Sequence, residues 1–294
     1  CEVKDSSSKT RIIPFAFNTE QTYIIELGQQ YARFIKDGSQ IATIVNDIES
    51  PVEISTPYKS KDLFNLKFAQ NADVLTLCHN DYEPRELSRN SHYDWSLDSI
   101  SFQPHINAPT ITSISWKGGN SNPKAYKYVV TAVKNSTYEE SICSNIATVT
   151  GEYESSWGTT EYITINFSTI EDAAEYNIYR EVNGVFAYVG TTSANYFIDD
   201  KIEPDLTSTA PIFKNPFENG DNPACVNYFQ QRKVYGCLKN NPQQLVASQT
   251  STNNNFNISR PLTASDSVNI TLSEREVNEI RHIIALNDLI LLTS

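Results

Sequence analysis

Ala125-Tyr-Lys-Tyr-Val-Val-Thr-Ala-Val133 is the stretch of sequence that decides the fold class. It consists mainly of β-branched and aromatic residues, which favour strands. Six similar runs surround it and are separated by turn residues: 111–116, 144–149, 162–167, 174–180, 185–189 and 195–198. Seven short strands in about 100 residues are typical of an immunoglobulin-like sandwich. The sequence therefore predicts a β-sandwich in the middle of the chain.

The flanking regions are also rich in strand-forming residues. Before the middle segment, such runs occur at 11–17, 22–27, 31–35, 40–45, 73–78 and 95–102. Among them, Asp37-Gly38 is a strong hairpin signal. After it, further runs occur at 227–235, 244–248, 255–258, 267–272, 280–284 and 289–293. Their roughly even spacing is typical of propeller blades.

These patterns predict an all-β chain, in which a β-rich scaffold with features of a partial propeller or barrel is interrupted by an inserted immunoglobulin-like sandwich. The predicted domains are a β-rich N-terminal domain over 1–103, the sandwich over 104–212 and the start of a propeller-like domain over 213–294. Two prolines in Gln103–Pro109 form the linker that marks the first boundary.

Two short segments predict something other than a strand. Ser60 is a suitable N-cap for a short helix, in which Leu63 with Leu66 and Phe64 with Phe68 have helical spacing. Lys117-Gly-Gly-Asn-Ser-Asn122 lacks the Gly-Lys-Ser/Thr ending and the following helix of a phosphate-binding loop, so it predicts a hairpin connection.

The charge balance limits the partners of this 294-residue chain. Lys and Arg number 23 against 35 Asp and Glu, which gives a formal net charge of −12. Proteins that bind nucleic acid tightly present clustered Lys and Arg to the phosphates, and no such run occurs. An acidic wall along which DNA slides without sticking is compatible with this charge. No apolar run reaches the roughly 18–20 residues of a membrane span, so no membrane binding is predicted.

The five cysteines have wide, unrelated spacings, which predicts free and mostly buried thiols rather than a disulfide framework or a zinc site. The chain has no methionine, and the apolar run Ile283–Ser294 resembles an interrupted strand, so we expect an internal fragment of a longer protein. The alternative is a mature bacterial lipoprotein, in which Cys1 carries the lipid and the polar Asp5–Ser8 follows it.

No pattern predicts catalysis, a metal or a cofactor. The possible metal ligands His79, Asp81, Glu83 and His92 lack the spacing of a ligand set and are interpreted as exposed loop residues. The carboxylate pairs Glu139–Glu140 and Asp199–Asp200 are interpreted as solvated turns, because adjacent residues of a strand point to opposite faces. We therefore predict that the protein is not an enzyme.

The middle segment resembles a fibronectin type III domain with an altered order of strands. Tyr126–Val133, followed by Glu139-Glu-Ser141 and Ser144, looks like the last two strands of that family. The runs that look like its earlier strands come later in the chain, at 163–167, 173–180, 188–192 and 196–199. Either the domain is circularly permuted, which a sandwich with neighbouring termini tolerates, or two incomplete copies lie in tandem. We favour permutation, because the combined set makes one complete sandwich.

The whole chain resembles the tail hub or nozzle proteins of short-tailed bacteriophages, the group often called tail tubular protein B. The similar stretches occur in the same order along nearly the full length: 2–5, 10–15, 20–28, 33–38, 69–75, 84–89, 220–223, 228–232 and 277–282. They include Pro84-Arg-Glu-Leu-Ser-Arg89 and Tyr228-Phe-Gln-Gln-Arg232. This is a family of structural proteins without a catalytic motif.

The resemblance implies a structural protein of the virion tail, assembled in the cytoplasm of the bacterial host. Members of the family form a ring, usually a hexamer, below the portal and adaptor (head-completion) protein. DNA passes through the channel without specific binding, and the outer surface docks tail fibres. The alternative is a surface-exposed lipoprotein or adhesin that binds carbohydrate or protein through the fibronectin-like domain.

Two pairs of residues are candidates for contacts in such a ring. Arg85 and Arg89 flank Leu87 and pair either with acidic groups of a neighbouring protomer or with water. Arg281 and His282 interrupt an apolar run, and they either face the lumen or make a lateral salt bridge.

Overall fold

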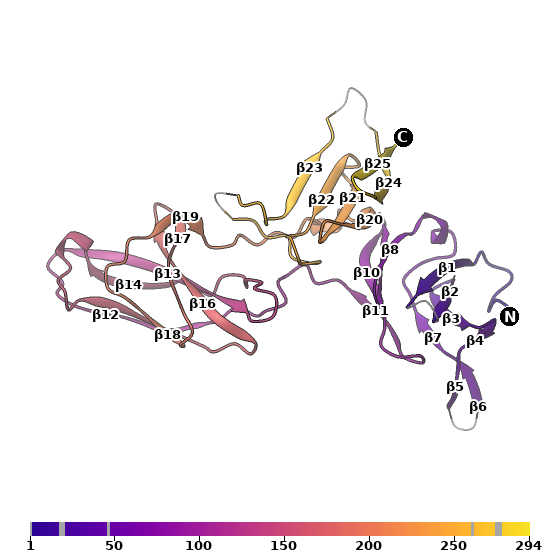
Figure 1. The fold of residues 1–294 in the computed structure, drawn as a ribbon, viewed down its shortest axis with the longest axis horizontal. Coiled ribbons are helices and arrows are strands. Elements are labelled where there is room, and N and C mark those ends of the chain that lie inside the picture. Colours follow the sequence, from indigo (N-terminus) through magenta and orange to yellow (C-terminus); the bar gives the residue numbers. More distant parts are fainter. Residues whose placement is uncertain (1, 18–20, 46–47, 260–261, 274–277) are drawn as a thin grey trace. The chain divides into compact units, whose positions relative to one another are not determined.

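The structure is a computed structural model that describes residues 2–17, 21–45, 48–259, 262–273 and 278–294. Within these residues the chain is all-β, which confirms the predicted fold class (Figure 1). The helical elements of the described part are three single 3₁₀ turns: η1 (Leu63–Asn65), η2 (Glu154–Ser156) and η3 (Glu218–Gly220). Every paired strand in the sheets is antiparallel to its neighbours.

The chain folds into two compact units, each made of separate segments. Unit 1 comprises Cys1–Ser101, Pro216–Ala247 and Val268–Ser294. Unit 2 comprises Phe102–Asn215 and Ser248–Ser267. The three successive domains expected over 1–103, 104–212 and 213–294 stay a prediction. The contacts place the beginning and the end of the chain in one unit, and they add a short late segment to the middle one.

The N-terminal part of unit 1 contains two sheets that share one apolar core. One sheet has the order β1 (Arg11–Ala16), β2 (Thr22–Gly28), β3 (Tyr31–Lys36) and β4 (Ser39–Gln40), with β7 (Glu53–Ser55) also paired to β3. The other has the order β11 (Trp95–Ser99), β10 (Tyr82–Arg89), β9 (Val74–His79) and β8 (Lys67–Asn71). A separate hairpin joins β5 (Ala42–Val45) and β6 (Ile48–Pro51). Trp95 stacks on Phe34 in the core, with 4.1 Å between ring centroids.

The expected hairpin at Asp37-Gly38 is confirmed, whereas the expected helix after Ser60 is wrong. Asp37 and Gly38 have φ values of 51° and 75°, as a tight hairpin turn requires, and they connect β3 to β4. Only the single turn η1 forms after Ser60, and its N-cap residue Asp62 makes no side-chain capping bond. Phe68 belongs instead to β8, where strand pairing with β9 overrides the helical spacing.

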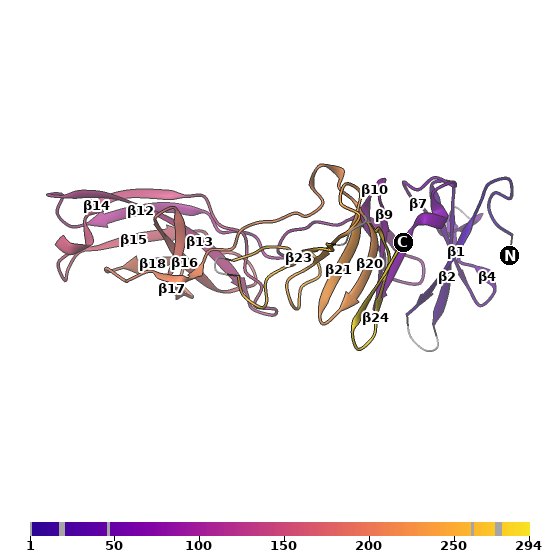
Figure 2. The same ribbon diagram turned by 90° about the horizontal axis from the view of Figure 1, so that it is seen from above.

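The C-terminal part of unit 1 packs on β8 and β9. Its sheet has the order β20 (Pro223–Phe229), β21 (Arg232–Leu238), β22 (Gln244–Ala247) and β23 (Val268–Thr271), and β24 (Ile280–Ala285) pairs with β25 (Leu289–Thr293). Figure 2 shows β20, β21 and β24 beside one another, and β24 contacts both of the other strands. Glu86 and Lys233 form an ion pair between this part and β10, and the Thr76 and Tyr228 hydroxyls are 3.1 Å apart.

Unit 2 contains a two-sheet sandwich. One sheet has the order β12 (Ile111–Lys117), β15 (Tyr162–Phe167) and β18 (Tyr196–Asp199). The other has the order β14 (Ala147–Glu152), β13 (Pro123–Lys134), β16 (Ala173–Val182), β17 (Val185–Thr192) and β19 (Asp205–Thr209). All seven expected strands form, and β19 is an eighth. Inward side chains such as Tyr128, Val130, Ile163 and Ile165 are fully buried between the sheets.

The connection after β12 differs from the prediction. β12 and β13 belong to different sheets, so residues 118–122 lead from one sheet to the other and do not close a hairpin. Tight local packing explains the glycines: a Cβ on Gly118 would lie 2.3 Å from the Trp116 ring, and one on Gly119 would lie 2.9 Å from the Glu152 carboxylate. Glycine suits these two positions because neighbouring side chains pack directly against the backbone, where a Cβ atom would be too close.

The described cysteines are free, as predicted, and Cys1 lies outside the described residues. Cys78, Cys225 and Cys237 are buried, and Cys143 is half-buried. Burial, and then the nearby Glu140 carboxylate, raise the pKa of Cys143 from 9.0 to about 11. The folded state therefore favours the neutral thiol. This contribution to stability is complete below pH 9 and is lost as the pH rises through about 11.

We expect iodoacetamide at pH 8 to label Cys143 about 100-fold more slowly in the folded protein than in urea. A pKa raised from 9.0 to about 11 lowers the thiolate fraction by that factor, and the thiolate is the reactive form. Peptide mass spectrometry over a time course measures the rate at each cysteine. Equal rates for Cys143 with and without urea would contradict this environment.

Candidate functional site

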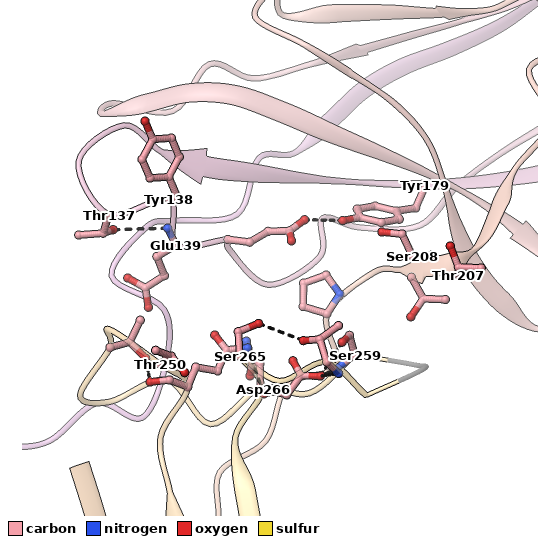
Figure 3. Close-up of a pocket in the computed structure, with 17 residues that line it drawn as sticks. Thr137, Tyr138, Glu139, Tyr179, Thr207, Ser208, Thr250, Ser259, Ser265 and Asp266 are labelled. Atoms are coloured by element: carbon pink, nitrogen blue, oxygen red, sulfur yellow. Dashed lines mark hydrogen bonds between the residues drawn. The ribbon is translucent and has the colours of Figure 1, made fainter. Parts of the chain in front are cut away.

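A polar pocket in unit 2 is the candidate site (Figure 3). It has a volume of about 310 Å³, at the lower end of the range of small-molecule sites. Three segments form its walls: the loop 137–140 after β13, residues 207–211 at the end of β19, and residues within 249–259 and 263–266 of the late segment. Figure 3 shows Thr137 and Tyr138 on one side and Thr250, Ser265 and Asp266 on the other.

The loop after β13 is a tight turn that exposes an aromatic ring. Tyr138 N–H donates to the Lys134 carbonyl at 2.9 Å, and Lys134 N–H donates to the Glu139 carbonyl at 2.9 Å. Tyr138 has a φ of 56°, in the left-handed region, and it is 78% exposed. Figure 3 shows its ring pointing outward at the rim. Among the non-glycine residues with positive φ in the described part, it is the only aromatic one.

Glu139 and Glu140 are held by donors from the chain. Glu139 is only 6% exposed, and its two carboxylate oxygens accept bonds from His105 N–H at 3.1 Å and from the Asn255 amide at 3.2 Å. Glu140 Oε1 accepts from the Tyr179 hydroxyl at 2.6 Å and from the Asn177 amide at 3.1 Å. The interpretation of Glu139 as part of a solvated turn is therefore wrong.

Tyr179 lines the pocket beside Glu140, and its hydroxyl is neutral. Burial, followed by the Glu140 carboxylate, raises the pKa of the Tyr179 hydroxyl far above its usual value. The hydroxyl therefore keeps its proton and donates a hydrogen bond to Glu140. This bond orients the Glu140 carboxylate on the pocket wall.

The opposite wall is organised by Asp266, which is 5% exposed. Its Oδ2 accepts bonds from the Ser259 hydroxyl at 2.6 Å and from Thr263 N–H at 2.8 Å. Thr250 N–H donates to the Ser265 carbonyl at 3.0 Å, which joins the two ends of the segment. These bonds connect Thr250, Ser259, Thr263, Ser265 and Asp266 on this wall of the pocket.

Asn257 contributes a buried side chain to the pocket lining. It is 1% exposed, and its Oδ1 accepts a bond from Lys214 N–H at 3.1 Å. Its Nδ2 has no hydrogen-bond partner among the described residues. A buried amide donor without an acceptor costs about 1–3 kcal/mol, so such a group calls for an explanation.

The electrostatic character of the pocket follows from its lining. Glu139, Glu140 and Asp266 are carboxylates, and the described residues of the lining include hydroxyls and amides but no Lys, Arg or His. Hydroxyl groups both donate and accept hydrogen bonds, and amides offer one group of each kind. The arrangement can bind a neutral ligand with many hydroxyls and disfavours an anion.

The four residues selected from the sequence lie in unit 1 and not in this pocket. Arg85 and Arg89 are half-buried on β10, and the Arg89 guanidinium lies 4.2 Å from the Phe17 ring centroid. Arg281 and His282 lie on β24 and are exposed.

Arg281 and His282 have neighbours within unit 1. Arg281 pairs with Glu279 of the same chain at 2.8 Å. The His282 Nε2 is 3.4 Å from the Lys67 amino group. Desolvation, followed by the Lys67 charge, lowers the pKa of His282, so the ring is neutral at pH 7. Their roles in a ring stay predictions.

The possible metal ligands do not come together. The described residues contain no group of three or more His, Cys, Asp or Glu side chains that could hold a metal ion. His79 is 8% exposed and accepts a bond from Asp81 N–H at 3.0 Å, so its interpretation as an exposed loop residue is wrong. Among the same residues, no helix has the length and apolar character to cross a membrane.

Sequence reasoning missed the pocket because its walls are far apart in the chain. The pair Glu139–Glu140 was noted, but its partner Asn255 lies 116 residues away from Glu139. The only local signal was the density of Ser, Thr and Asn in residues 248–267. A scan against protein-family models and a search of curated proteins found no match to the chain.

Proposed function

We propose that the protein is a structural component of a short bacteriophage tail, a subunit of the nozzle or hub ring around the DNA-ejection channel. Unit 1 is the ring scaffold, and unit 2 is a module inserted into it. The observation that carries this proposal is the distribution of the stretches that resemble tail tubular proteins. All of them fall within the segments of unit 1, and none falls within 102–215 or 248–267. Glu20 and Val277, at the ends of two stretches, lie outside the described residues.

Contacts between these stretches support the assignment of one scaffold. Glu86, within the similar stretch 84–89, pairs with Lys233, which directly follows the stretch 228–232. Tyr228 of the latter stretch contacts Thr76 of β9. Residues that are about 150 positions apart therefore meet in one folded unit. This is the expected arrangement if a module was inserted between two halves of an older scaffold.

The charge of the chain fits a channel wall. A net charge of −12 disfavours tight binding of DNA and permits its passage. Closed rings form through heterologous contacts, in which one surface of a subunit binds a different surface of the next. Exposed apolar side chains on the outer face of β1 and β2, Ile12 at 60% and Ile24 at 43%, are candidates for one such surface.

We expect sixfold rings by negative-stain electron microscopy when the chain is purified together with the adaptor protein of the same phage tail. Light scattering coupled to size-exclusion chromatography measures the mass of the same sample. The chain without the adaptor is the control for spontaneous assembly. A monomer in the presence of the adaptor would contradict the proposal.

A second candidate is a surface lipoprotein or adhesin, and the polar pocket of the fibronectin-like unit is the observation that favours it. The complete reading frame distinguishes the two. A lipobox directly before Cys1 would support the lipoprotein, whereas portal and adaptor genes beside the frame would support the tail protein.

A further inference from the structure

We propose that the pocket of unit 2 binds a neutral carbohydrate chain, with one sugar residue seated between the Glu140 wall and the Asp266 wall. This inference depends on the pocket alone and goes beyond the structural function of unit 1. Ring formation in the proposed function does not require sugar binding, and sugar binding at the pocket does not require a ring. The two proposals therefore fail separately.

The walls have the hydrogen-bonding capacity that a sugar requires. Each sugar hydroxyl is both a donor and an acceptor, and the Thr207, Ser208 and Thr250 hydroxyls have the same dual capacity. The carboxylates of Glu140 and Asp266 add acceptors that are already fixed in place by chain donors. Fixed groups lose little conformational entropy when a ligand binds, which favours affinity.

Asn257 points to a ligand independently of the carboxylates. Its Nδ2 is a donor that is buried in the pocket lining and lacks an acceptor in the described part of the chain. A sugar oxygen seated beside Asn257 would accept this bond. The cost of the unpaired donor would then be recovered in the bound state.

Tyr138 is the third observation, and it concerns the rim. A bulky residue with positive φ is a conformational outlier, and turn positions of this kind favour Gly or Asn. Residues in sparsely populated backbone conformations are concentrated at functional sites. An exposed Tyr ring offers an apolar face for the C–H groups of a sugar and a hydroxyl for hydrogen bonds. A second residue of the carbohydrate chain would lie against it as the chain leaves the pocket.

The described lining contains carboxylates but no Lys, Arg or His, and this charge distribution disfavours anionic ligands. Uronic or sialic acids would bring a carboxylate close to Glu139, Glu140 and Asp266 without an opposite charge. A lysine-rich peptide would find the same carboxylate acceptors, but its ammonium groups only donate hydrogen bonds and offer no acceptor to the Asn257 Nδ2 donor. A neutral polyol fits the mixed donors and acceptors better than either charged ligand.

The test is saturation-transfer NMR on the full chain with cellohexaose, maltohexaose, oligogalacturonate and trilysine as separate probes. We expect transfer to at least one of the two neutral oligosaccharides, with a Kd of about 1 mM or below, and none to oligogalacturonate.

Ser208→Tyr places a large side chain on an exposed strand position of the pocket wall and should weaken binding at least tenfold. Ser115→Tyr, the same change at an exposed position of β12 outside the pocket, should leave binding unchanged.

The Tyr138→Asn variant distinguishes the effect of Tyr138 on stability, through its backbone strain, from its effect on sugar affinity. Because Asn tolerates positive φ, this variant should have a Tm higher by roughly 2–4 °C and a lower affinity for the sugar. No transfer to either neutral oligosaccharide, or a preference for trilysine or oligogalacturonate, would overturn the proposal. Equal affinities of the Ser208→Tyr and Ser115→Tyr variants would overturn it as well.

Discussion

Replacing Asp199 by Ala is expected to reduce the free energy of unfolding of unit 2 by about 3–5 kcal/mol. The Asp199 side chain is fully buried, and its Oδ2 lies 2.6 Å from the guanidinium of Arg180, which is 4% exposed. The substitution leaves that buried charge unpaired, and removing one partner of a buried ion pair carries a cost of this size. The interpretation of Asp199 as part of a solvated turn is wrong for the same reason.

Several other groups depend on Asp199. Its Oδ1 accepts bonds from Lys201 N–H at 3.1 Å and Ile202 N–H at 2.9 Å, and the Tyr128 hydroxyl donates to its Oδ2 at 2.7 Å. Burial lowers the pKa of Arg180, but Asp199 and Tyr128 outweigh that effect and raise it, so the guanidinium stays charged. The carboxylate thus connects the two sheets of the sandwich to the turn after β18.

Urea unfolding monitored by tryptophan fluorescence measures this loss, because Trp116 and Trp157 lie in unit 2 and report its transition. Asp205→Ala is the matched control, since Asp205 is exposed and its Oδ1 accepts local bonds from Thr207, two residues along β19. The control should change stability by less than about 1 kcal/mol. Equal effects of the two substitutions would contradict a buried ion pair at Asp199.

Replacing Glu86 by Leu should destabilise unit 1 by about 3 kcal/mol. Lys233 has a fully buried side chain and forms an ion pair with Glu86, which is 25% exposed. The partial exposure of Glu86 places the expected cost at the lower end of the range for buried pairs. Lys233 belongs to β21 and Glu86 to β10. Losing their ion pair should therefore weaken the packing between the C-terminal and N-terminal parts of unit 1 before other contacts.

Two further variants isolate the pair. Combining Glu86→Leu with Lys233→Met removes both charges and should restore most of the stability, because an apolar pair can replace a buried ion pair at little cost. Lys239→Met breaks the exposed pair with Asp81 at 2.9 Å and should cost less than about 1 kcal/mol. Hydrogen exchange of β20 and β21 amides measures the local effect. A double variant no more stable than Glu86→Leu alone would argue against an unpaired charge as the cause.

The strands could be predicted from local sequence because their signals are local. Ala125–Val133 falls within β13, and Asp37-Gly38 supplies the positive φ values of its hairpin. The compositional runs also located the sandwich strands in a chain without helices longer than one turn in its described part. Alternation and turn chemistry act over a few residues, so they are readable without knowledge of the rest of the fold.

The burial of charged residues could not be predicted, because it depends on distant partners. Asp199-Asp200-Lys201 has the composition of a turn, yet Asp199 meets Arg180 of β16 in the sandwich interior. Glu139 likewise follows an exposed loop and is buried by contact with Asn255. The helix expected after Ser60 failed for a similar reason, since pairing with β9 decides the conformation of Phe68.

During translation, the pocket lacks one of its walls until the late segment 248–267 has been synthesised. β22 ends at Ala247 and β23 begins at Val268, and these two residues are register partners, so the segment leaves unit 1 and returns to the same hairpin. The ribosome has delivered every described strand of the sandwich once Thr209 is added, but it adds Asn257 and Asp266 only after β20, β21 and β22. A nascent chain that stops after β19 therefore contains a complete sandwich without its second wall. Binding at the proposed pocket therefore requires translation through Asp266, after β20, β21 and β22 of unit 1.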